Sequence, residues 1–277
     1  MVDGKTKIYG IIGNPVSHSL SPAMHNAAFA ALAENRIYLP FPVEDVQAAL
    51  AGLKALHICG VSVTIPHKET VIPSLDRIDP VALKIGAVNT IDIRTEEGAR
   101  ILCGSNTDWL GANRALESQI GLSQARVVLL GAGGSARAIG FGLREAGAGL
   151  VLCSRSEPKG RALAAELGCP WFPLSGLASL EGDVLVNATS VGMSPRLDAS
   201  PVPAAILPAY QVVMDIVYAP LQTTLLREAE QAGCRTINGL EMLLYQGVAQ
   251  FELWTGLSAP VEVMRRALLK CTGGDLS

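Results

Sequence analysis

Two residues of this 277-residue chain have side chains that together could move a proton at a carbonyl group. Lys68 follows a short apolar stretch with the character of a strand, and Asp108 stands where a helix is expected to begin. A lysine can protonate a carbonyl oxygen that becomes an alkoxide during hydride transfer, provided that a carboxylate orients it. In an open α/β sheet both residues could face the crevice at the carboxyl ends of the strands. Spacing alone does not pair them, and such residues are more often ordinary surface charges.

A glycine-rich stretch indicates a second kind of chemistry, the binding of a dinucleotide. The apolar run 127–130 ends in Gly131-Ala132-Gly133-Gly134-Ser135 and resumes as a helix-like pattern. Gly131 can make the turn after the strand, Gly133 lets the backbone approach a pyrophosphate, and Ala136 takes the third small position. The free N–H groups and the dipole of the helix would then bind the phosphates. The alternative is an ordinary left-handed turn between a buried strand and a helix.

The residues after the next apolar run, 150–153, indicate which dinucleotide would bind. An NAD-binding fold places an acidic residue here to accept hydrogen bonds from the ribose, whereas this chain has Ser154-Arg155-Ser156 and then Lys159. A guanidinium can grip a 2′-phosphate with two hydrogen bonds and stack on the adenine. Because the nearby carboxylate, Glu157, lies past the strand end, the sequence favours NADP over NAD. The alternative is a solvated loop with ordinary surface charges.

Length and composition exclude several other classes of function. A chain of 277 residues suits two domains, and its net charge of −3, with both signs scattered, argues against a nucleic-acid surface. No apolar run approaches the roughly 18 residues of a membrane span, and the N-terminus does not resemble a signal peptide. The four histidines lack metal-ligand spacing, so neither a metal site nor a catalytic histidine is expected. Six cysteines, far apart beside apolar segments, predict buried reduced thiols in a cytoplasmic protein.

The elements that must position these residues are those of an α/β protein. The first hundred residues alternate strand and helix, which predicts a mainly parallel sheet, and the turn at 96–98 predicts a hairpin. Ser21 is the expected N-cap of a helix over 22–34, with Pro22 at its first position. The later expected elements are a helix capped by Thr107 or Asp108 and ending near 120, strands at 184–187 and 212–216, and helices at 239–256 and 261–269.

Six motifs give the chain a resemblance to a known family. The stretch Gly13-Asn14-Pro15-Val16-Ser17-His18-Ser19-Leu20-Ser21-Pro22 resembles the opening signature of shikimate dehydrogenases. The other motifs match that family in order and together span nearly the whole chain. They are Val63-Thr64-Ile65-Pro66-His67-Lys68, Ile85-Gly86-Ala87-Val88-Asn89-Thr90, Gly104-Ser105-Asn106-Thr107-Asp108, Asn187-Ala188-Thr189-Ser190-Val191-Gly192-Met193 and Asn238-Gly239-Leu240-Glu241-Met242-Leu243.

The resemblance implies a reversible NADP-linked reduction of 3-dehydroshikimate to shikimate, with Lys68 as acid and base and Asp108 as its partner. Shikimate presents a carboxylate and three hydroxyls, which a site of hydroxyls and amides can satisfy without burying unpaired charge. The residues that match the family's substrate contacts are Ser17, Ser19, Thr64, Asn89, Gln246 and, as a further candidate, Tyr218. The residues that match positions at the nicotinamide end are Thr189, Ser190, Ile216, Gly239 and Met242.

Substrate-matching residues occur near both ends of the chain, at Ser17 and Gln246, so two α/β domains are expected. Residues 1–108 and 240–277 would form the substrate domain, and residues 109–239 a Rossmann-type domain that binds NADP. The expected partner is the small-molecule substrate, and a homodimer is left open.

Two departures from the family pattern keep other interpretations open. The family's motif often reads Asn-Arg-Thr where this chain has Ser154-Arg155-Ser156, so the cofactor preference could be relaxed. Quinate/shikimate dehydrogenases share most of the motifs, which leaves activity on quinate open, although the type that uses NAD would carry an acid near Ser156. A third interpretation is a non-catalytic, regulatory protein that binds NADP, against which the intact Lys68 and Asp108 argue.

Overall fold

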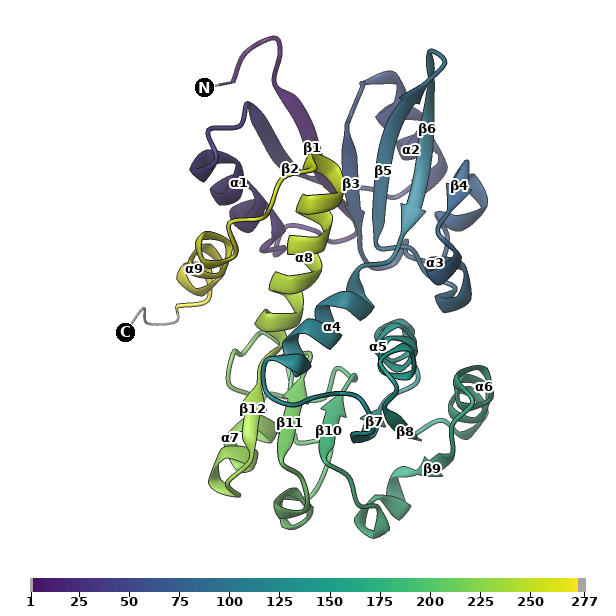
Figure 1. Ribbon diagram of the computed structural model, residues 1–277, viewed down its shortest axis with the longest axis vertical. Coiled ribbons are helices and arrows are strands. Elements are labelled where there is room, and N and C mark those ends of the chain that lie inside the picture. Colours follow the sequence, from purple (N-terminus) through teal and green to yellow (C-terminus); the bar gives the residue numbers. More distant parts are fainter. Residues whose placement is uncertain (1, 274–277) are drawn as a thin grey trace. The chain divides into compact units, whose positions relative to one another are not determined.

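The structure, a computed structural model, describes residues 2–273 (Figure 1). The chain divides into two compact units, one formed by the residues up to Thr107 together with those from Gly247 on, and one formed by Asp108–Gln246. In each unit helices pack against a six-stranded sheet, which confirms the expected α/β class.

The sheet of the first unit has the strand order β2-β1-β3-β5-β6-β4. The expected parallel pairing holds for β1 with β2 and β3, but β5 runs antiparallel to both β3 and β6. The expected hairpin joins β5 to β6 through Glu97 and Gly98, whose positive φ angles of 49° and 83° suit a two-residue turn. The described elements of this unit are β1 (Lys7–Gly13), α1 (Ser21–Ala31), β2 (Arg36–Pro42), α2 (Val46–Ala55), β3 (Gly60–Val63), the 3₁₀ turn Ile72–Ser74, β4 (Arg77–Ile78), α3 (Pro80–Ile85), β5 (Thr90–Glu96), β6 (Ala99–Ser105) and α9 (Val261–Cys271).

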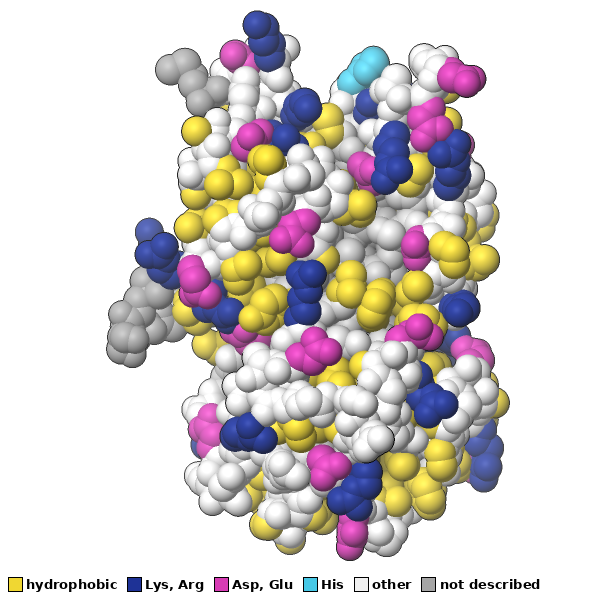
Figure 2. All heavy atoms as spheres, in the orientation of Figure 1, with side chains coloured by type: hydrophobic (Ala, Val, Ile, Leu, Met, Phe, Trp, Pro, Cys, Tyr) yellow, Lys and Arg dark blue, Asp and Glu magenta, His cyan; other side chains and the backbone are white. Residues whose placement is uncertain are grey.

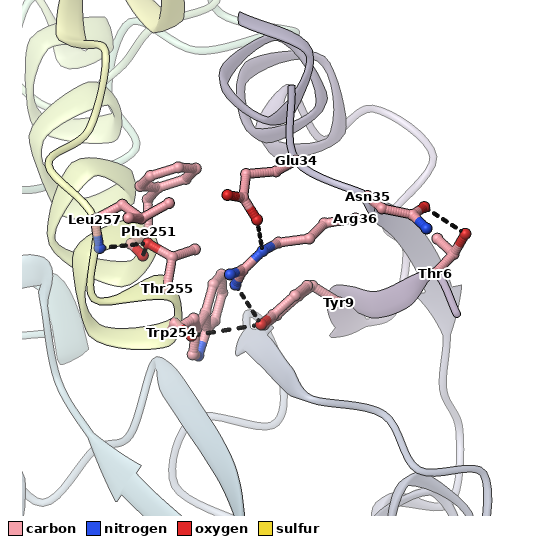
Figure 3. A network of polar contacts seen from close by, with 9 residues as sticks. All are labelled: Thr6, Tyr9, Glu34, Asn35, Arg36, Phe251, Trp254, Thr255 and Leu257. Carbon is pink, nitrogen blue, oxygen red and sulfur yellow. Dashed lines mark hydrogen bonds and ion pairs between the residues drawn. The ribbon is translucent and has the colours of Figure 1, made fainter. Parts of the chain in front are cut away.

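Aromatic side chains hold the last turns of α8 (Gly239–Thr255) in the first unit. The ring of Tyr9, on β1, lies 5.5 Å from that of Trp254 and 5.6 Å from that of Phe29. Figure 3 shows the polar border of this cluster. The Tyr9 hydroxyl donates to the Trp254 carbonyl oxygen (3.4 Å) and accepts from Arg36 (2.9 Å), whose guanidinium also pairs with Glu34 (2.8 Å).

The sheet of the second unit has the strand order β12-β11-β10-β7-β8-β9, with parallel pairing throughout the described strands. This is the order of a doubly wound Rossmann sheet, in which β7 and β10 flank the point where the direction of winding reverses. Dinucleotides bind at the carboxyl ends of the strands at this point. The described elements are α4 (Asp108–Glu117), β7 (Arg126–Leu130), α5 (Gly134–Glu145), β8 (Gly149–Ser154), α6 (Glu157–Leu167), β9 (Trp171–Pro173), the 3₁₀ turns Leu174–Ser179 and Ala204–Ala209, β10 (Val184–Asn187), β11 (Val212–Asp215), α7 (Thr224–Gln231) and β12 (Arg235–Ile237).

The first turns of α8 belong to the second unit. Met242 packs in the apolar core of that unit. Gly111 of α4 lets the two helices approach, because a Cβ atom there would lie 2.7 Å from the carbonyl oxygen of Met242 and 2.8 Å from the amide nitrogen of Gln246. This division differs from the predicted one at residue 108 and at residues 240–246, which the prediction places in the substrate domain.

Two local expectations differ from the structure. Ser21 is not the N-cap of α1, because the helix already begins at Ser21 and the hydroxyl that accepts from its amide is that of Ser19 (3.3 Å). The cysteines are free thiols, and Cys153 and Cys234 are buried as expected, but Cys271 is exposed at the end of α9. Between residues 2 and 273, no helix combines the length and the hydropathy that a membrane span needs.

The ring of His25, on α1, is completely buried in the aromatic cluster of the first unit. It stacks on Tyr38 at 4.5 Å and lies 5.5 Å from the ring of Trp254. Neither ring nitrogen makes a well-formed hydrogen bond to a described residue. Burial lowers the pKa of His25 to about 3, and the nearby Gln250 side chain opposes this only weakly. His25 is therefore neutral in the folded protein at pH 5 and above.

We expect His25→Phe to make the protein less sensitive to acid. The unfolded chain takes up a proton near pH 6.5 but the folded protein only near pH 3, so the stability that the neutral ring provides is lost as the pH falls between these values. At about 1.4 kcal/mol per pH unit, the wild type should lose about 2 kcal/mol more than the variant between pH 6.5 and 4.5, as measured by urea unfolding. The exposed His57 is the control, and His57→Asn should behave like the wild type. Parallel losses in wild type and His25→Phe would contradict the assignment.

Candidate functional site

The carboxyl ends of β1 and β3 bring the first polar side chains of the site together. The amide of Thr64 donates to the Ile12 carbonyl oxygen (3.0 Å), and the amide of Asn14 donates to that of Ile65 (3.0 Å). Gly13 makes this contact feasible, since a Cβ atom at that position would collide with Cγ2 of Thr64. The loop after β1 then carries Ser17, which is exposed, and Ser19, which is half-buried.

Lys68 lies in a loop that is held from two sides. A ring nitrogen of His67 is 2.8 Å from the carbonyl oxygen of Val43, and the amide of Val88 donates to the carbonyl oxygen of Lys68 (2.8 Å). His67 is buried, so it anchors the loop, while the neighbouring Lys68 is half-buried. The position of the Lys68 backbone is therefore fixed relative to the start of β5.

Asn89 is the polar centre of this edge. Its Oδ1 accepts from the amide of Thr107 (2.7 Å) and from the hydroxyl of Thr90 (2.7 Å), and its Nδ2 donates to the hydroxyl of Thr107 (3.0 Å). Its carbonyl oxygen accepts from the amide of Val63 (2.7 Å). Because Asn89 is only 2% exposed, these bonds form in a site from which water is largely excluded. They fix Thr107, the residue that precedes Asp108.

The structure adds Gln250 to this edge, a residue that the sequence analysis did not single out. Its Nε2 donates to the Thr90 hydroxyl (2.8 Å) and to the Asn89 carbonyl oxygen (3.2 Å), and its Oε1 accepts from the Ser62 hydroxyl (2.8 Å). Ser62 in turn accepts from the hydroxyl of Tyr38 (2.6 Å). The sequence does hold a weak signal, since Gln250 stands one helical turn after Gln246 on the same face of α8.

The glycine-rich turn of the second unit follows β7. Gly131 has a φ of 118°, and a Cβ atom there would lie 2.9 Å from the carbonyl oxygen of Ala188, so a side chain is excluded. Gly133 and Gly134 are exposed, and Cβ atoms on them would meet nothing within 4 Å. Helix α5 begins at Gly134 without a side-chain cap, so its first N–H groups remain available for an anion. This turn, with Ala132 and Ser135 half-buried within it, fits a pyrophosphate.

The loop after β8 uses its first serine internally. Ser154 is buried, donates to the carbonyl oxygen of Ser156 (3.0 Å) and accepts from the indole N–H of Trp171 (2.9 Å). Arg155 and Lys159 are exposed, and Ser156 is half-buried. Ser154 therefore shapes the loop, and the groups that can meet a 2′-phosphate are the two cations and the second serine.

The loops after β10 and β11 carry the remaining candidates of this unit. The Thr189 hydroxyl donates to Oδ1 of Asn187 (2.7 Å), and Ser190 is exposed beside it. After β11, burial raises the pKa of the half-buried Tyr218. Gly239 lets α8 begin against this loop, because a Cβ atom there would collide with the carbonyl oxygen of Ile216.

The candidate residues therefore divide between the two units. The first unit brings five of them to one edge of its sheet: Ser17, Ser19, Thr64, Lys68 and Asn89. The second unit holds the glycine-rich turn, the cationic loop and the loops after β10 and β11. It also contains Asp108 at the start of α4, Tyr218, the buried Met242, and Gln246, whose side chain donates to the Leu243 carbonyl oxygen (2.8 Å). Among residues 2–273, no three His, Cys, Asp or Glu residues form a metal-binding group.

The strand order, the glycine-rich turn and the uncapped helix of the second unit define a dinucleotide-binding protein of the Rossmann class. The shikimate dehydrogenase substrate binding domain family matches residues 11–91, and the shikimate 5′-dehydrogenase C-terminal domain family matches residues 239–269. Shikimate dehydrogenase (NADP(+)) of Moorella thermoacetica is 48% identical, over 99% of this chain and 96% of its own length. The chain belongs to the shikimate dehydrogenase family, as the motifs predicted.

Two solved structures extend this comparison. Shikimate 5-dehydrogenase from Thermus thermophilus, in complex with NADP(H) and shikimate, is 39% identical with a TM-score of 0.87, over 96% of this chain and all of its own. Quinate dehydrogenase from Corynebacterium glutamicum, in complex with NAD, is 29% identical with a TM-score of 0.89, over 96% of this chain and 99% of its own. The fold is thus shared by relatives whose names differ in substrate and cofactor.

Figure 2 shows side chains of both charges scattered over one face of this chain, as its composition predicted.

The contacts of Gln250 predict a large loss of stability in Gln250→Leu. The substitution leaves the Ser62 hydroxyl without its acceptor and the Thr90 hydroxyl without a donor, both in buried surroundings. At about 1–3 kcal/mol for each buried group, the free energy of unfolding should fall by about 2–4 kcal/mol in urea titrations. Gln246→Leu is the matched control, because the Gln246 side chain donates to a carbonyl of its own helix, and it should cost less than about 1 kcal/mol. Equal losses in the two variants would contradict this account.

Proposed function

We propose that this protein catalyses the reversible, NADPH-dependent reduction of 3-dehydroshikimate to shikimate. The observation that carries the proposal is the edge of the first unit's sheet, where main-chain hydrogen bonds hold Lys68 close in the fold to Thr64 and Asn89. The names of its relatives, which include NADP-dependent shikimate dehydrogenases, support the same reaction.

Hydroxyl and amide groups of the site suit the polar groups of this substrate. Shikimate has a carboxylate and three hydroxyls, and each needs a partner once it leaves water. Hydroxyls can donate or accept, and amides offer both kinds of group, so one set of side chains can satisfy all four substituents. We propose that Ser17, Ser19, Thr64, Asn89, Tyr218 and Gln246 contact the substrate.

We propose Lys68 as the acid and base of the reaction. When bound, NADPH supplies the hydride to the keto carbon. The carbonyl oxygen then needs a proton, which the Lys68 ammonium group donates, and the resulting amine takes a proton back from the hydroxyl in the reverse reaction. We propose Asp108 as the carboxylate that orients this ammonium group and supports its charge. The loop anchors of Lys68 support this role, because a proton donor must be held within hydrogen-bond reach.

Arg155, Lys159 and Ser156 are proposed to bind the 2′-phosphate of NADP. The two cations are exposed at the carboxyl end of β8, and an acid that would repel the phosphate is missing from positions 154–156. We propose that the turn from Gly131 to Ser135 holds the pyrophosphate. Thr189, Ser190, Ile216, Gly239 and Met242 are proposed to line the nicotinamide end.

Activity on quinate is the second candidate function, and the likeness to a quinate dehydrogenase favours testing it. Spectrophotometric oxidation of shikimate and of quinate, each with NADP and with NAD, separates the candidates. We expect shikimate with NADP to give the highest kcat/KM. A protein that binds NADP but oxidises neither substrate would instead be the regulatory alternative. A cytoplasmic location and a homodimer stay predictions.

The proposed role of Lys68 predicts that charge alone does not sustain the reaction. Lys68→Ala should lower kcat by about 10²–10⁴-fold, the usual contribution of general acid–base catalysis, with a smaller change in KM. Lys68→Arg should not restore the rate, because a guanidinium keeps the charge but does not release its proton at accessible pH. Asp108→Asn should also lose rate. Near wild-type kcat in Lys68→Arg would show that the lysine is only an electrostatic anchor and that the proton has another source.

The proposed role of Arg155 predicts a selective loss of NADP binding. Arg155→Asp removes a charge-assisted contact and adds repulsion, so NADP affinity should fall by about 1.5–3 kcal/mol in titration calorimetry, while NAD affinity changes little. Arg126→Gln is the control, since Arg126 pairs with Asp183 at the amino end of β7 and should not affect either cofactor. Unchanged NADP affinity in Arg155→Asp would refute the assignment.

A further inference from the structure

A buried carboxylate lies at the carboxyl end of β11 in the second unit. Asp215 has no exposed surface and accepts three hydrogen bonds. Its Oδ1 accepts from Nδ2 of Asn187 (2.9 Å) and from the amide of Val217 (3.0 Å), and its Oδ2 accepts from the hydroxyl of Thr223 (2.7 Å). The carboxylate therefore contacts the end of β10, the loop after β11 and the N-cap of α7.

These contacts reach the residues proposed for the nicotinamide end. Asn187 also accepts from the amide (3.1 Å) and the hydroxyl (2.7 Å) of Thr189, and its carbonyl oxygen accepts from the amide of Ile216 (3.1 Å). Oδ1 of Asn187 thus holds Thr189, while Nδ2 of the same side chain is held by the carboxylate of Asp215. Through Val217, the same carboxylate holds the backbone beside Ile216 and Tyr218.

The surroundings of Asp215 disfavour its charge. Burial raises the pKa of Asp215 to about 6, and the neutral donors Val217, Thr223 and Asn187 oppose this shift only in part. The titratable and charged side chains of the packed elements are not among the described hydrogen-bond partners of Asp215, and three of them have partners of their own. They are Arg227, Glu228 and Glu230 in α7, Arg235 in β12, and Glu241 in the first turn of α8. Arg227 donates to Thr224, and Glu230 accepts from Gln222 and Thr236. Arg235 donates to the Gln119 carbonyl oxygen.

From this geometry we infer that Asp215 is a positioning residue that sets the loops after β10 and β11 for the nicotinamide end of the cofactor. The inference rests on the proposed cofactor site. An ionised acceptor makes stronger hydrogen bonds than a neutral one, so the carboxylate form holds both loops more firmly. Ionisation of Asp215 costs folding stability because burial raises its pKa, and the three hydrogen bonds that the carboxylate accepts fix the geometry of the loops.

The inference predicts a pH effect confined to one end of the dinucleotide. Asp215 is mainly ionised at pH 8 and mainly protonated at pH 5, so the loops should hold the nicotinamide end less well at pH 5. A phosphate monoester also titrates near pH 6, which affects NADP at its 2′-phosphate. 2′-Phospho-ADP-ribose carries that phosphate and the pyrophosphate of NADP but lacks the nicotinamide ring. The ratio of its Kd to the Kd of NADP therefore isolates the nicotinamide end.

The experiment measures both Kd values between pH 5 and 8 for the whole protein and for two variants. In the wild type, the advantage of NADP over 2′-phospho-ADP-ribose should shrink about threefold to tenfold as the pH falls through 6. In Asp215→Asn, which resembles the protonated form, the advantage should be small at every pH and should equal the wild-type value at pH 5. In Asp183→Asn, a carboxylate change at the amino end of β10, the wild-type profile should persist.

Thermal unfolding at pH 8 separates positioning from a purely structural role. Because the ionised carboxyl opposes folding, Asp215→Asn should not lower the melting temperature. Parallel pH profiles in wild type and Asp215→Asn, or an equal loss of binding for NADP and 2′-phospho-ADP-ribose with a lowered melting temperature, would overturn the inference. If the wild type binds neither compound, the proposed cofactor site itself fails, and Asp215 is then not a positioning residue.

Discussion

The candidate site of the first unit depends on the hydrogen bonds of the buried Asn89. It joins Thr107 and Thr90 through its side chain and Val63 through its carbonyl oxygen, at distances of 2.7–3.0 Å. Thr107 directly precedes Asp108, and Val63 directly precedes Thr64, so these bonds connect segments that carry candidate residues. Since a buried polar group left unpaired costs about 1–3 kcal/mol, the network favours one arrangement of these segments over others. Gln250 completes it from α8.

In the second unit, the loops of the candidate site are held instead by close contacts between main-chain segments. Gly131 faces the Ala188 carbonyl oxygen, and Gly239 faces that of Ile216, with no room for a Cβ atom at either place. The loops after β7, β10 and β11 can therefore approach one another at the carboxyl edge of the sheet. Backbone that is packed in this way offers N–H groups to phosphates without a side chain in between.

Two buried titratable groups respond to pH in opposite ways. His25 stays neutral while the unfolded chain takes up a proton, so its contribution to stability is lost as the pH falls from about 6.5. Asp215 takes up a proton near pH 6 in the folded state, so the stability linked to its protonation is lost as the pH rises through that value. The histidine packs in an aromatic cluster, whereas the aspartate connects loops at the proposed cofactor site. The ionised Asp215 thus lowers the stability of the fold at the place where its hydrogen bonds fix the loops after β10 and β11.

The sequence by itself determined the elements whose signals are local. The glycines of the turn 131–134, the Glu97-Gly98 hairpin and the cations at 155 and 159 could be identified because each depends on residues close in the chain. The family motifs also predicted Lys68 and Asn89 as members of one site. The antiparallel pairing of β5 with β3 was missed, because a strand pattern does not state its direction.

Only the tertiary structure decided how the polar groups are used. Gln250 meets Thr90 across 160 positions of sequence, and Trp171 engages the hydroxyl of Ser154, which sequence alone assigned to the cofactor. Likewise, the structure places the start of α1 at Ser21, whose amide donates to the Ser19 hydroxyl, with no side chain capping the helix. A hydrogen bond is fixed by distance and direction between atoms, and those are known only when the strands and helices have been placed against one another.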